Sequence, residues 1–307
     1  MKFYDWKGLY GSCYKKTLCY APGMQSNLTS TIKALTPNMQ GHDYFVGDIH
    51  GNFEGLRQAL DAVGFKSNKD RLIAVGDLVD RQPRGDLAIH WLKAPFFHSI
   101  RGNHEDLYLK WRSLKNDIDA QEEYEERLYF RGSNGGSWVR KYDESVHCIL
   151  EEALSQLPYF LSVPLPDGKV IGVVHAEFPD NTCWPRVMMS LLERNKDLID
   201  SMTWGRERWR SARKQQDPFE DKNQIFGLDA VVCGHVRVPH PLALGNIVYL
   251  DTGGWLERGK FSILRSDEIL AMAEAETGDA LPSSHQIDDE EEQTTDEAAK
   301  LALSSQR

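Results

Sequence analysis

The sequence predicts an α/β fold with a strand-rich second half. Short apolar runs bounded by turn residues predict strands, and two helical patterns separate the first three of these runs. From about residue 228 onward, short strands dominate. This order of elements is typical of an α/β protein that opens with a βαβαβ unit. The predicted strands span residues 43–47, 71–75, 97–100, 170–174, 230–233, 247–250 and 261–264.

The connections between the first strands have helical periodicity. Phe53, Leu56 and Leu60 follow Asn52 at helical spacing, and asparagine is a favourable N-cap residue. A second apolar pattern over residues 87–92 predicts the next helix. Residues 105–160 are predicted to be mostly helical, apart from a glycine-rich break at residues 132–136.

Composition and charge limit the classes of protein to consider. The chain has 307 residues, of which 41% are hydrophobic and 27% are charged, and its formal net charge is −10. The acidic balance argues against binding to nucleic acid or to a membrane surface, because such binding depends on Lys and Arg. Neither an apolar run of membrane-spanning length nor a signal-peptide pattern occurs, so we expect a cytoplasmic protein. The sequence leaves the oligomeric state open, and a monomer is the default expectation. Five scattered cysteines without C-x-x-C spacing fit reduced thiols.

The sequence divides into three segments. Residues 1–40 are predicted to be an N-terminal extension, and residues 41–272 contain the predicted strands and helices of one domain. Residues 273–307 are predicted to be an acidic, disordered tail, because the segment is poor in aromatic residues and rich in Glu, Asp, Ser and Thr.

Polar side chains follow five of the predicted strands at the point where each strand ends. The first strand is followed by "GDIHG", the second by "GDLVDR" and the third by "RGNHE". Single histidines follow the strands at 170–174 and 230–233. Because ligands bind at the carboxyl ends of strands in α/β sheets, we expect these side chains to meet in one crevice. The pooled set consists of Asp48, His50, Asp77, Asn103, His175 and His235.

This set of residue types predicts a metal site. It offers nitrogen and oxygen ligands and no thiolate, which suits a pair of divalent ions such as manganese, iron or zinc. One shared carboxylate can bridge two ions roughly 3.5–4 Å apart, the arrangement used for in-line displacement at phosphorus. Taken alone, an Asp-x-His pair is more often a turn or a cap, and a histidine after a strand is more often structural. Three such patterns in order make coincidence a poor explanation.

The same motifs resemble those of a known enzyme family. "GDIHG", "GDLVDR" and "RGNHE", followed by a histidine after a strand and a later "GH", are similar to the motifs of the phosphoprotein phosphatase family of metallophosphoesterases. The bacteriophage lambda type is the most similar, with "SNGGSW", "WGRERW" and "YLDTGG" in its connecting segments. The resemblance covers about residues 43–265. It implies a calcineurin-like catalytic domain in which two mixed β-sheets form a sandwich flanked by helices.

The resemblance implies a role for each motif residue. Two divalent ions, most readily Mn²⁺ with iron or zinc as alternatives, would share Asp77. One ion would also bind Asp48 and His50, and the other Asn103, His175 and His235. A metal-activated hydroxide would attack phosphorus directly, without a phosphoenzyme.

The neighbouring residues acquire roles in the same way. His104 would be the general acid that protonates the leaving alkoxide, and Asp80 would orient it. Arg81 and Arg206 match the phosphate clamps of the family, for which the planar guanidinium is well suited. Arg101 would either bind phosphate as well or serve as a structural partner for a nearby carboxylate.

These residues lead to a prediction of function with two alternatives. We predict a metal-dependent phosphatase acting on phosphoserine and phosphothreonine in proteins, with phosphotyrosine left open. Symmetrical diadenosine tetraphosphatases share the metal motifs but tend to carry Ala in place of Asp80 and Asp in place of Glu105. A catalytically inactive phosphate-binding scaffold would be expected to lack a ligand, and none is missing here. The chain departs from the family at Gln82-Pro83, where glycine usually follows the Asp-Arg pair.

Overall fold

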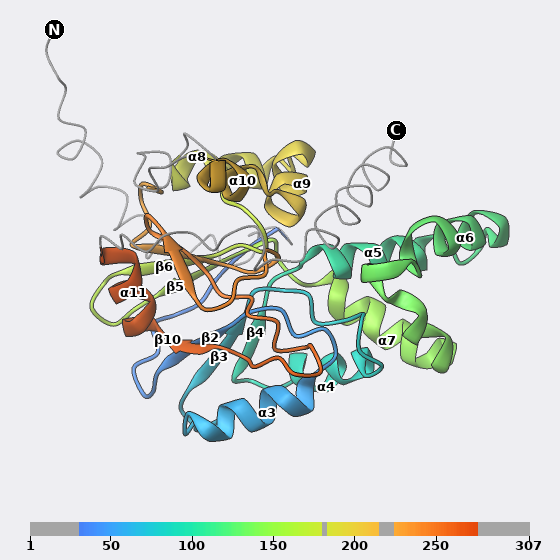
Figure 1. Ribbon diagram of the computed structural model, residues 1–307, viewed down its shortest axis with the longest axis horizontal. Helices are drawn as coiled ribbons and strands as arrows, with labels where there is room; N and C mark the ends of the chain where they lie inside the picture. Colours follow the sequence, from blue (N-terminus) through green and yellow to red (C-terminus); the bar gives the residue numbers. More distant parts are fainter. Residues whose placement is uncertain (1–30, 180–182, 215–223, 276–307) are drawn as a thin grey trace, which may run out of the picture.

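The computed structural model describes residues 31–179, 183–214 and 224–275, which form two β-sheets packed face to face with helices outside (Figure 1). Most of the predicted N-terminal extension and nearly all of the predicted acidic tail lie outside the described residues. None of the described helices is long and apolar enough to cross a membrane. The predicted α/β class, with two mixed sheets flanked by helices, is confirmed.

A four-stranded sheet is built mainly from the first third of the chain. Its central and edge strands β2, β3 and β4 are parallel, and β10 pairs with β2 in the antiparallel sense. In Figure 1, helices α3 and α4 lie below this sheet. The strands, in spatial order, are β10 (Ile263–Arg265), β2 (Asp43–Val46), β3 (Arg71–Ala74) and β4 (Phe97–Ser99), and the helices are α3 (Phe53–Ala62) and α4 (Ala88–Leu92), the latter after a 3₁₀ turn, η1 (Gly85–Leu87).

A six-stranded sheet is built from later segments and from one strand near the N-terminus. The order is β1 (Ile32–Ala34), β5 (Phe160–Pro164), β6 (Val170–Val173), β7 (Ala230–Cys233), β9 (Ile247–Tyr249) and β8 (Leu242–Leu244). The pairs β1–β5, β6–β7 and β7–β9 are parallel, and the other two are antiparallel. Its outer face is covered by α8 (Trp184–Leu192), α9 (Lys196–Trp204) and α10 (Glu207–Lys214), at the top of Figure 1.

Alternating side chains on the strands build three core layers. In β2, Tyr44 and Val46 pack toward α3, whereas Phe45 packs between the sheets. In β7, Val232 points between the sheets and Val231 points to the outer helices. Because successive residues of a strand face opposite sides, strands buried on both faces are continuously apolar, as these are. The layers hold the strand ends in fixed positions.

The remaining helices lie beside the sheets. At the right of Figure 1 are α5 (Asn103–Ser113), α6 (Ile118–Tyr124) and α7 (Glu144–Ser155), joined by a π-helical turn, η2 (Glu125–Tyr129), and by two 3₁₀ turns, η3 (Gly132–Asn134) and η4 (Gly136–Lys141). Helix α11 (Ser266–Glu274) buries Ile269 and Leu270 against residues of both sheets.

All seven predicted strands are present, and so are the predicted helices after the first and second strands and the mostly helical region. Strands β1, β5 and β8 and helices α8–α11 were not predicted. Strand β1 has Lys33 between its two apolar residues, and β5 begins where the predicted helical region ends. Strand β8 is a short apolar run before Gly245 and Asn246, a hairpin signal that was overlooked. Strand β1 pairs with β5, so the sheet extends into the predicted N-terminal extension. The boundaries 1–40, 41–272 and 273–307 stay a proposal.

Candidate active site

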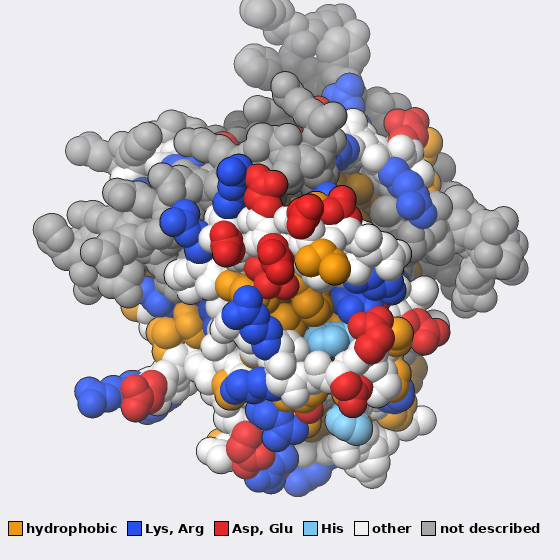
Figure 2. All heavy atoms as spheres, turned by 90° about the vertical axis from the view of Figure 1, so that its right-hand side faces the viewer, with side chains coloured by type: hydrophobic (Ala, Val, Ile, Leu, Met, Phe, Trp, Pro, Cys, Tyr) orange, Lys and Arg blue, Asp and Glu red, His pale blue; other side chains and the backbone are white. Residues whose placement is uncertain are grey.

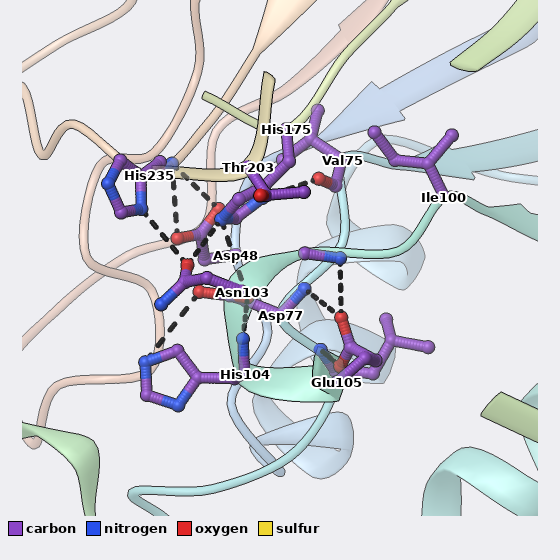
Figure 3. A network of polar contacts seen from close by, with 12 residues as sticks. Asp48, Val75, Asp77, Ile100, Asn103, His104, Glu105, His175, Thr203 and His235 are labelled. Atoms are coloured by element: carbon purple, nitrogen blue, oxygen red, sulfur yellow. Dashed lines mark hydrogen bonds and ion pairs between the residues drawn. The ribbon is translucent and has the colours of Figure 1, made fainter. Parts of the chain in front are cut away.

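The six predicted metal ligands meet at the carboxyl ends of strands from both sheets. Figure 3 labels all of them except His50. Loops after β2, β3 and β4 bring three segments of the chain to this point, and loops after β6 and β7 bring two more. All six side chains are buried, with exposed fractions of 8% or less: Asp48, His50, Asp77, Asn103, His175 and His235. On the face at the right of Figure 1, drawn in Figure 2, side chains of both charges lie around a hydrophobic area that has histidine beside it.

His50 is oriented by the backbone of a neighbouring loop. Its Nδ1 lies 2.9 Å from the carbonyl oxygen of Val79, to which it can donate a proton. In that tautomer Nε2 carries a lone pair, and Nε2 has no hydrogen-bond partner although it is buried. Nε2 lies 3.5 Å from Oδ2 of Asp77 and 3.9 Å from Oδ2 of Asp48. Burial, followed by the charges of Arg81 and His104, lowers the pKa of His50 well below its usual value.

His175 and His235 lie on the other side of Asp77. Nδ1 of His175 lies 2.8 Å from the carbonyl oxygen of Val75, which leaves its Nε2 facing Oδ1 of Asn103 at 2.8 Å and Oδ1 of Asp77 at 3.4 Å. Nδ1 of His235 lies 3.1 Å from the same Asn103 oxygen. The backbone N–H of His235 also donates to Asp48. Asn103 therefore joins ring nitrogens that come from two separate strands.

These residues fit a pair of cations. Two groups of side chains have ligand atoms within 4.8 Å of one another, His50–Asp77–His104 and Asp77–His175–His235, and Asp77 belongs to both. The lone pair of His50 faces two carboxylates, an arrangement that a positive ion between them would stabilise. Hydrogen bonds from the outer nitrogens of His50 and His175 to backbone carbonyls are the usual support of metal-binding imidazoles.

The charges around the site also favour cations. Burial, then repulsion by Asp251 and Asp77, raises the pKa of Asp48 well above its usual value. Burial lowers the pKa of His175, but the carboxylates of Asp77 and Asp48 outweigh it and raise that pKa to about 10. Both pKa values are raised because the site holds an excess of buried negative charge. Such a site favours binding of a cation, either a proton or a metal ion.

His104 and Asp80 form a buried pair beside the ligands. Nδ1 of His104 lies 2.9 Å from Oδ2 of Asp80, and Nε2 has no hydrogen-bond partner. That free Nε2 lies 3.9 Å from Oδ2 of Asp77. Oδ1 of Asp80 accepts hydrogen bonds from the hydroxyl of Tyr129 at 2.9 Å and from the indole N–H of Trp138 at 2.7 Å. The arrangement holds one imidazole nitrogen on a carboxylate and aims the other at the ligand cluster.

The three predicted phosphate ligands have different surroundings. The guanidinium of Arg81 lies 4.2 Å above the ring of Trp255, which in turn contacts the ring of His50. Nε of Arg206 lies 3.1 Å from Nε2 of His235.

The contacts of Arg101 favour the structural alternative. Its guanidinium donates to the hydroxyl of Tyr159 and to the carbonyl oxygen of Ser155, and it lies 3.5 Å from the carboxylate of Asp106. These partners belong to helices and loops beside the site, so the charge of Arg101 is already satisfied away from the cluster.

The backbone of the site adopts unusual conformations. Six described residues other than glycine have a positive φ, and five belong to the site: His50, Asp77, Asp80, Arg81 and His235. Residues with a side chain rarely adopt this region, and such strain collects at functional sites. Gln82 is not among them, so the position after Arg81 does not require the glycine usual in the family. The side chain of Gln82 instead donates to the carbonyl oxygen of Trp255.

Several residues that shape the site were not assigned roles from sequence. The carboxylate of Glu105 accepts the backbone N–H groups of Asp77, Leu78 and Gly102, and so ties two ligand loops together. Tyr129, Trp138 and Trp255 were also missed. Trp138 and Trp255 lie within or directly after "SNGGSW" and "YLDTGG", and that proximity was the available signal.

The fold and the site together define a class of protein. Residues 44–239 match the family model described as calcineurin-like phosphoesterase, and the chain belongs to this family of metallophosphoesterases. It is therefore a hydrolase of phosphate esters, from a family that uses divalent metals.

Among its members, the chain is similar to bacterial serine/threonine phosphatases. It is 30% identical to serine/threonine-protein phosphatase 1 of Salmonella typhimurium over 217 residues, which cover 69% of this chain and 86% of the relative. Identity to serine/threonine-protein phosphatase 2 of the same organism is 28%, covering 72% and 91%. The predicted membership of the phosphoprotein phosphatase family is confirmed.

Two further matches are to proteins whose names describe another activity. A symmetrical bis(5'-nucleosyl)-tetraphosphatase of Psychromonas ingrahamii is 41% identical over 68 residues, which cover 22% of this chain and 24% of the relative. A crystal structure described as a candidate diadenosine tetraphosphatase matches with a TM-score of 0.50 and 22% identity, covering 77% of this chain and 98% of that one. The structural match supports the fold.

Proposed function

We propose that the protein is a metal-dependent phosphatase that hydrolyses phosphoserine and phosphothreonine in proteins. The observation that carries the proposal is the pair formed by His104 and Asp80, with an imidazole nitrogen 2.9 Å from a buried carboxylate. Serine and threonine alkoxides are poor leaving groups, and a general acid removes that barrier. Asp80 orients His104 so that Nε2 can deliver a proton to the departing oxygen.

Two divalent ions, for which we propose Mn²⁺, would supply Lewis acidity for the attack of water on phosphorus. The residues proposed to hold one ion are Asp48, His50 and Asp77, and those for the other are Asp77, Asn103, His175 and His235. Asp77 would belong to both sets, because its two oxygens face different histidines, Oδ2 toward His50 and Oδ1 toward His175.

Arg81 and Arg206 are proposed to hold the phosphoryl oxygens. They contact different parts of the ligand cluster: Arg81 stacks on Trp255 beside His50, and Arg206 donates to His235. A guanidinium can donate two parallel hydrogen bonds to a phosphoryl group and keeps its charge at any working pH. We leave Arg101 out of this role, because its contacts lie elsewhere.

The alternative function is symmetrical hydrolysis of diadenosine tetraphosphate. It is favoured by the 41% identity to a symmetrical tetraphosphatase, although that match spans 68 residues. The serine/threonine phosphatase relatives match over 217 and 225 residues. Asp80 also argues for the phosphatase, since a nucleotide is a better leaving group than an alkoxide and needs less help from a general acid.

The test compares three substrates on the purified chain. We expect metal-dependent turnover of p-nitrophenyl phosphate and of a phosphoserine peptide in Mn²⁺, slower turnover of diadenosine tetraphosphate, and none with a chelator. A preference for the dinucleotide would establish the alternative, and absence of any metal-dependent turnover would exclude both enzymes.

The general acid is tested by His104→Asn. On a phosphoserine peptide we expect kcat to fall by roughly 10²–10⁴-fold, the usual contribution of a general acid. On p-nitrophenyl phosphate the loss should be far smaller, because p-nitrophenolate departs without protonation. Equal losses on both substrates would rule out His104 as the acid.

A further inference from the structure

The carboxylate of Asp80 is held by a segment of the chain about 50 residues away. The hydroxyl of Tyr129 and the indole N–H of Trp138 both donate to Oδ1, at 2.9 and 2.7 Å, while Oδ2 faces His104. Asp80, Tyr129 and Trp138 are all nearly inaccessible to solvent, so water does not compete for these bonds.

We propose that Trp138 and Tyr129 are positioning residues for catalysis, acting on His104 through Asp80. The inference rests on the proposed function, in which His104 protonates the leaving group. With both acceptor directions of Oδ1 filled, the carboxylate plane cannot rotate, and Oδ2 stays directed at Nδ1 of His104. Because Nδ1 of His104 is held on Asp80, the direction of its Nε2 is fixed as well.

The backbone of Asp80 and Arg81 needs the same support. Both residues have a left-handed conformation, with φ of 68° and 62°, which persists only where surrounding structure imposes it. The N–H of Arg81 donates to the carbonyl oxygen of Gly135 at 3.2 Å. A Cβ on Gly135 would lie 2.7 Å from the Cα of Arg81, so this close approach requires glycine. The "SNGGSW" segment thus contacts Asp80 by a side chain and Arg81 by its backbone.

Two further glycines make room for the donor rings. A Cβ on Gly85 would lie 2.7 Å from the ring of Trp138, and one on Gly136 would lie 2.5 Å from the ring of Tyr129. Tyr108 stacks on Trp138 with an angle of 18° between the ring planes. The indole is therefore confined on more than one side, and its N–H has one orientation toward Asp80.

The first test removes one donor and keeps the ring. Trp138→Phe deletes the indole N–H, and we expect kcat on a phosphoserine peptide to fall ~10-fold, as for loss of one hydrogen bond to a charged group. On p-nitrophenyl phosphate kcat should change by less than ~2-fold, because that reaction does not depend on the general acid. KM for both substrates should stay within ~2-fold, since phosphate binding is not altered.

The chain offers a matched control. Trp111 is also buried, and its indole N–H also donates to a carboxylate, that of Glu125 at 2.7 Å, but Glu125 is not part of the site. Trp111→Phe removes the same kind of bond and should leave the ratio of the two activities unchanged. If Trp111→Phe alters that ratio as much as Trp138→Phe, the effect comes from general loosening and the inference is wrong.

A second test asks whether the effect passes through His104. In the His104→Asn background, Trp138→Phe should lower kcat no further on the peptide, because the group it positions is gone. An additional ~10-fold loss there would overturn the inference. If Trp138→Phe does not fold, Tyr129→Phe makes the same comparison through the other donor, with Tyr124→Phe as its control, since Tyr124 donates to the carbonyl oxygen of Leu107.

The outcome separates the inference from the proposed function. If wild-type protein shows no metal-dependent hydrolysis, the proposed function fails. If wild type is active and His104→Asn shows the leaving-group signature, but Trp138→Phe and Tyr129→Phe affect both substrates equally or not at all, only the inference fails.

Discussion

The two sheets contribute different chemistry to the candidate site. The four-stranded sheet supplies the carboxylates of Asp48, Asp77 and Asp80 from the loops after β2 and β3. The same sheet also supplies the nitrogen-containing side chains of His50, Asn103 and His104. The six-stranded sheet, with the loops after β6 and β7, supplies two imidazoles, those of His175 and His235. We call the side of the four-stranded sheet the acidic half and the side of the six-stranded sheet the imidazole half. They meet at Asn103, whose carbonyl oxygen lies within 3.1 Å of the rings of His175 and His235.

This division has a physical reason. Carboxylates buried together repel one another, and repulsion by Asp251, which follows β9 of the six-stranded sheet, and by Asp77 raises the pKa of Asp48 beyond the effect of burial alone. Imidazoles from the opposite sheet can approach the carboxylates without adding negative charge. The two halves therefore need each other, or a cation, and Asp77 is the residue in contact with both.

The largest expected effect comes from removing the shared charge with Asp77→Asn. An amide cannot bridge two cations as a carboxylate does, so kcat/KM on the phosphoserine peptide should fall at least ~10³-fold. The variant should also lose the rise in Tm that Mn²⁺ gives the wild type, because bound ligand stabilises the folded state. Kinetics and thermal unfolding with and without Mn²⁺ measure both.

The control is Asp61→Asn, on helix α3 beside the same sheet, where the side chain is 73% exposed. Both activity and the Mn²⁺-dependent Tm should match wild type. A full Tm response to Mn²⁺ in Asp77→Asn would mean that Asp77 is not a shared ligand.

The next largest effect is expected for the two arginines, Arg81 beside His50 and Arg206 beside His235. Arg81→Lys and Arg206→Lys should each raise KM by about 10-fold, because lysine lacks the two-pronged donor geometry. Arg206 also contacts the imidazole of His235, whereas Arg81 stacks on the ring of Trp255. Only Arg206→Lys should therefore change the Mn²⁺ concentration required for half-maximal activity.

Metal titrations of the two variants at saturating substrate make the comparison. An unchanged Mn²⁺ requirement in both would show that the contact between Arg206 and His235 has no bearing on metal binding. A change in Arg81→Lys alone would reverse the roles assigned to the two halves.

The acidic half could be predicted from sequence far better than its surroundings. Asp48, His50, Asp77 and Asn103 lie directly after strands in short motifs, so their order and spacing carry the information. His175 and His235 were found through the rule that parallel strands end at one edge, which needs only the strands to be located.

The contacts that orient the site follow no such local pattern. Tyr129 and Trp138 reach Asp80 across separations of 49 and 58 residues, and Glu105 binds backbone groups 27 and 28 residues earlier. These partners are fixed by how α5, η2 and η4 pack beside the four-stranded sheet. Strand β1 was missed for the same reason, since its three residues form a strand only by pairing with β5.

The smallest expected effect is on the free energy of unfolding, and it comes from His98, which lies between the two sheets and outside the candidate site. His98 in β4 lies in register with Ile73, which packs between the sheets, so its imidazole faces the inner side. Burial, followed by the charges of Lys33 on β1 and Arg71 on β3, lowers the pKa of His98 to about 4, against the weaker pull of Asp43. The folded state therefore holds this imidazole neutral.

Lowering the pH should therefore lower the free energy of unfolding, because the folded state keeps His98 neutral. The imidazole of the unfolded chain, with a pKa of about 6.5, takes up a proton before the folded one, so stability is lost as the pH falls from about 6.5 toward about 4. Ideal linkage gives ~2 kcal/mol between pH 7.5 and 5, and partial exposure reduces this to about 1 kcal/mol. His98→Gln cannot titrate and should lose about 1 kcal/mol less than wild type in urea unfolding over that range. His90→Gln, on the exposed face of α4, should follow wild type. Parallel losses in His98→Gln and wild type would mean that the junction between the sheets does not depend on a neutral His98.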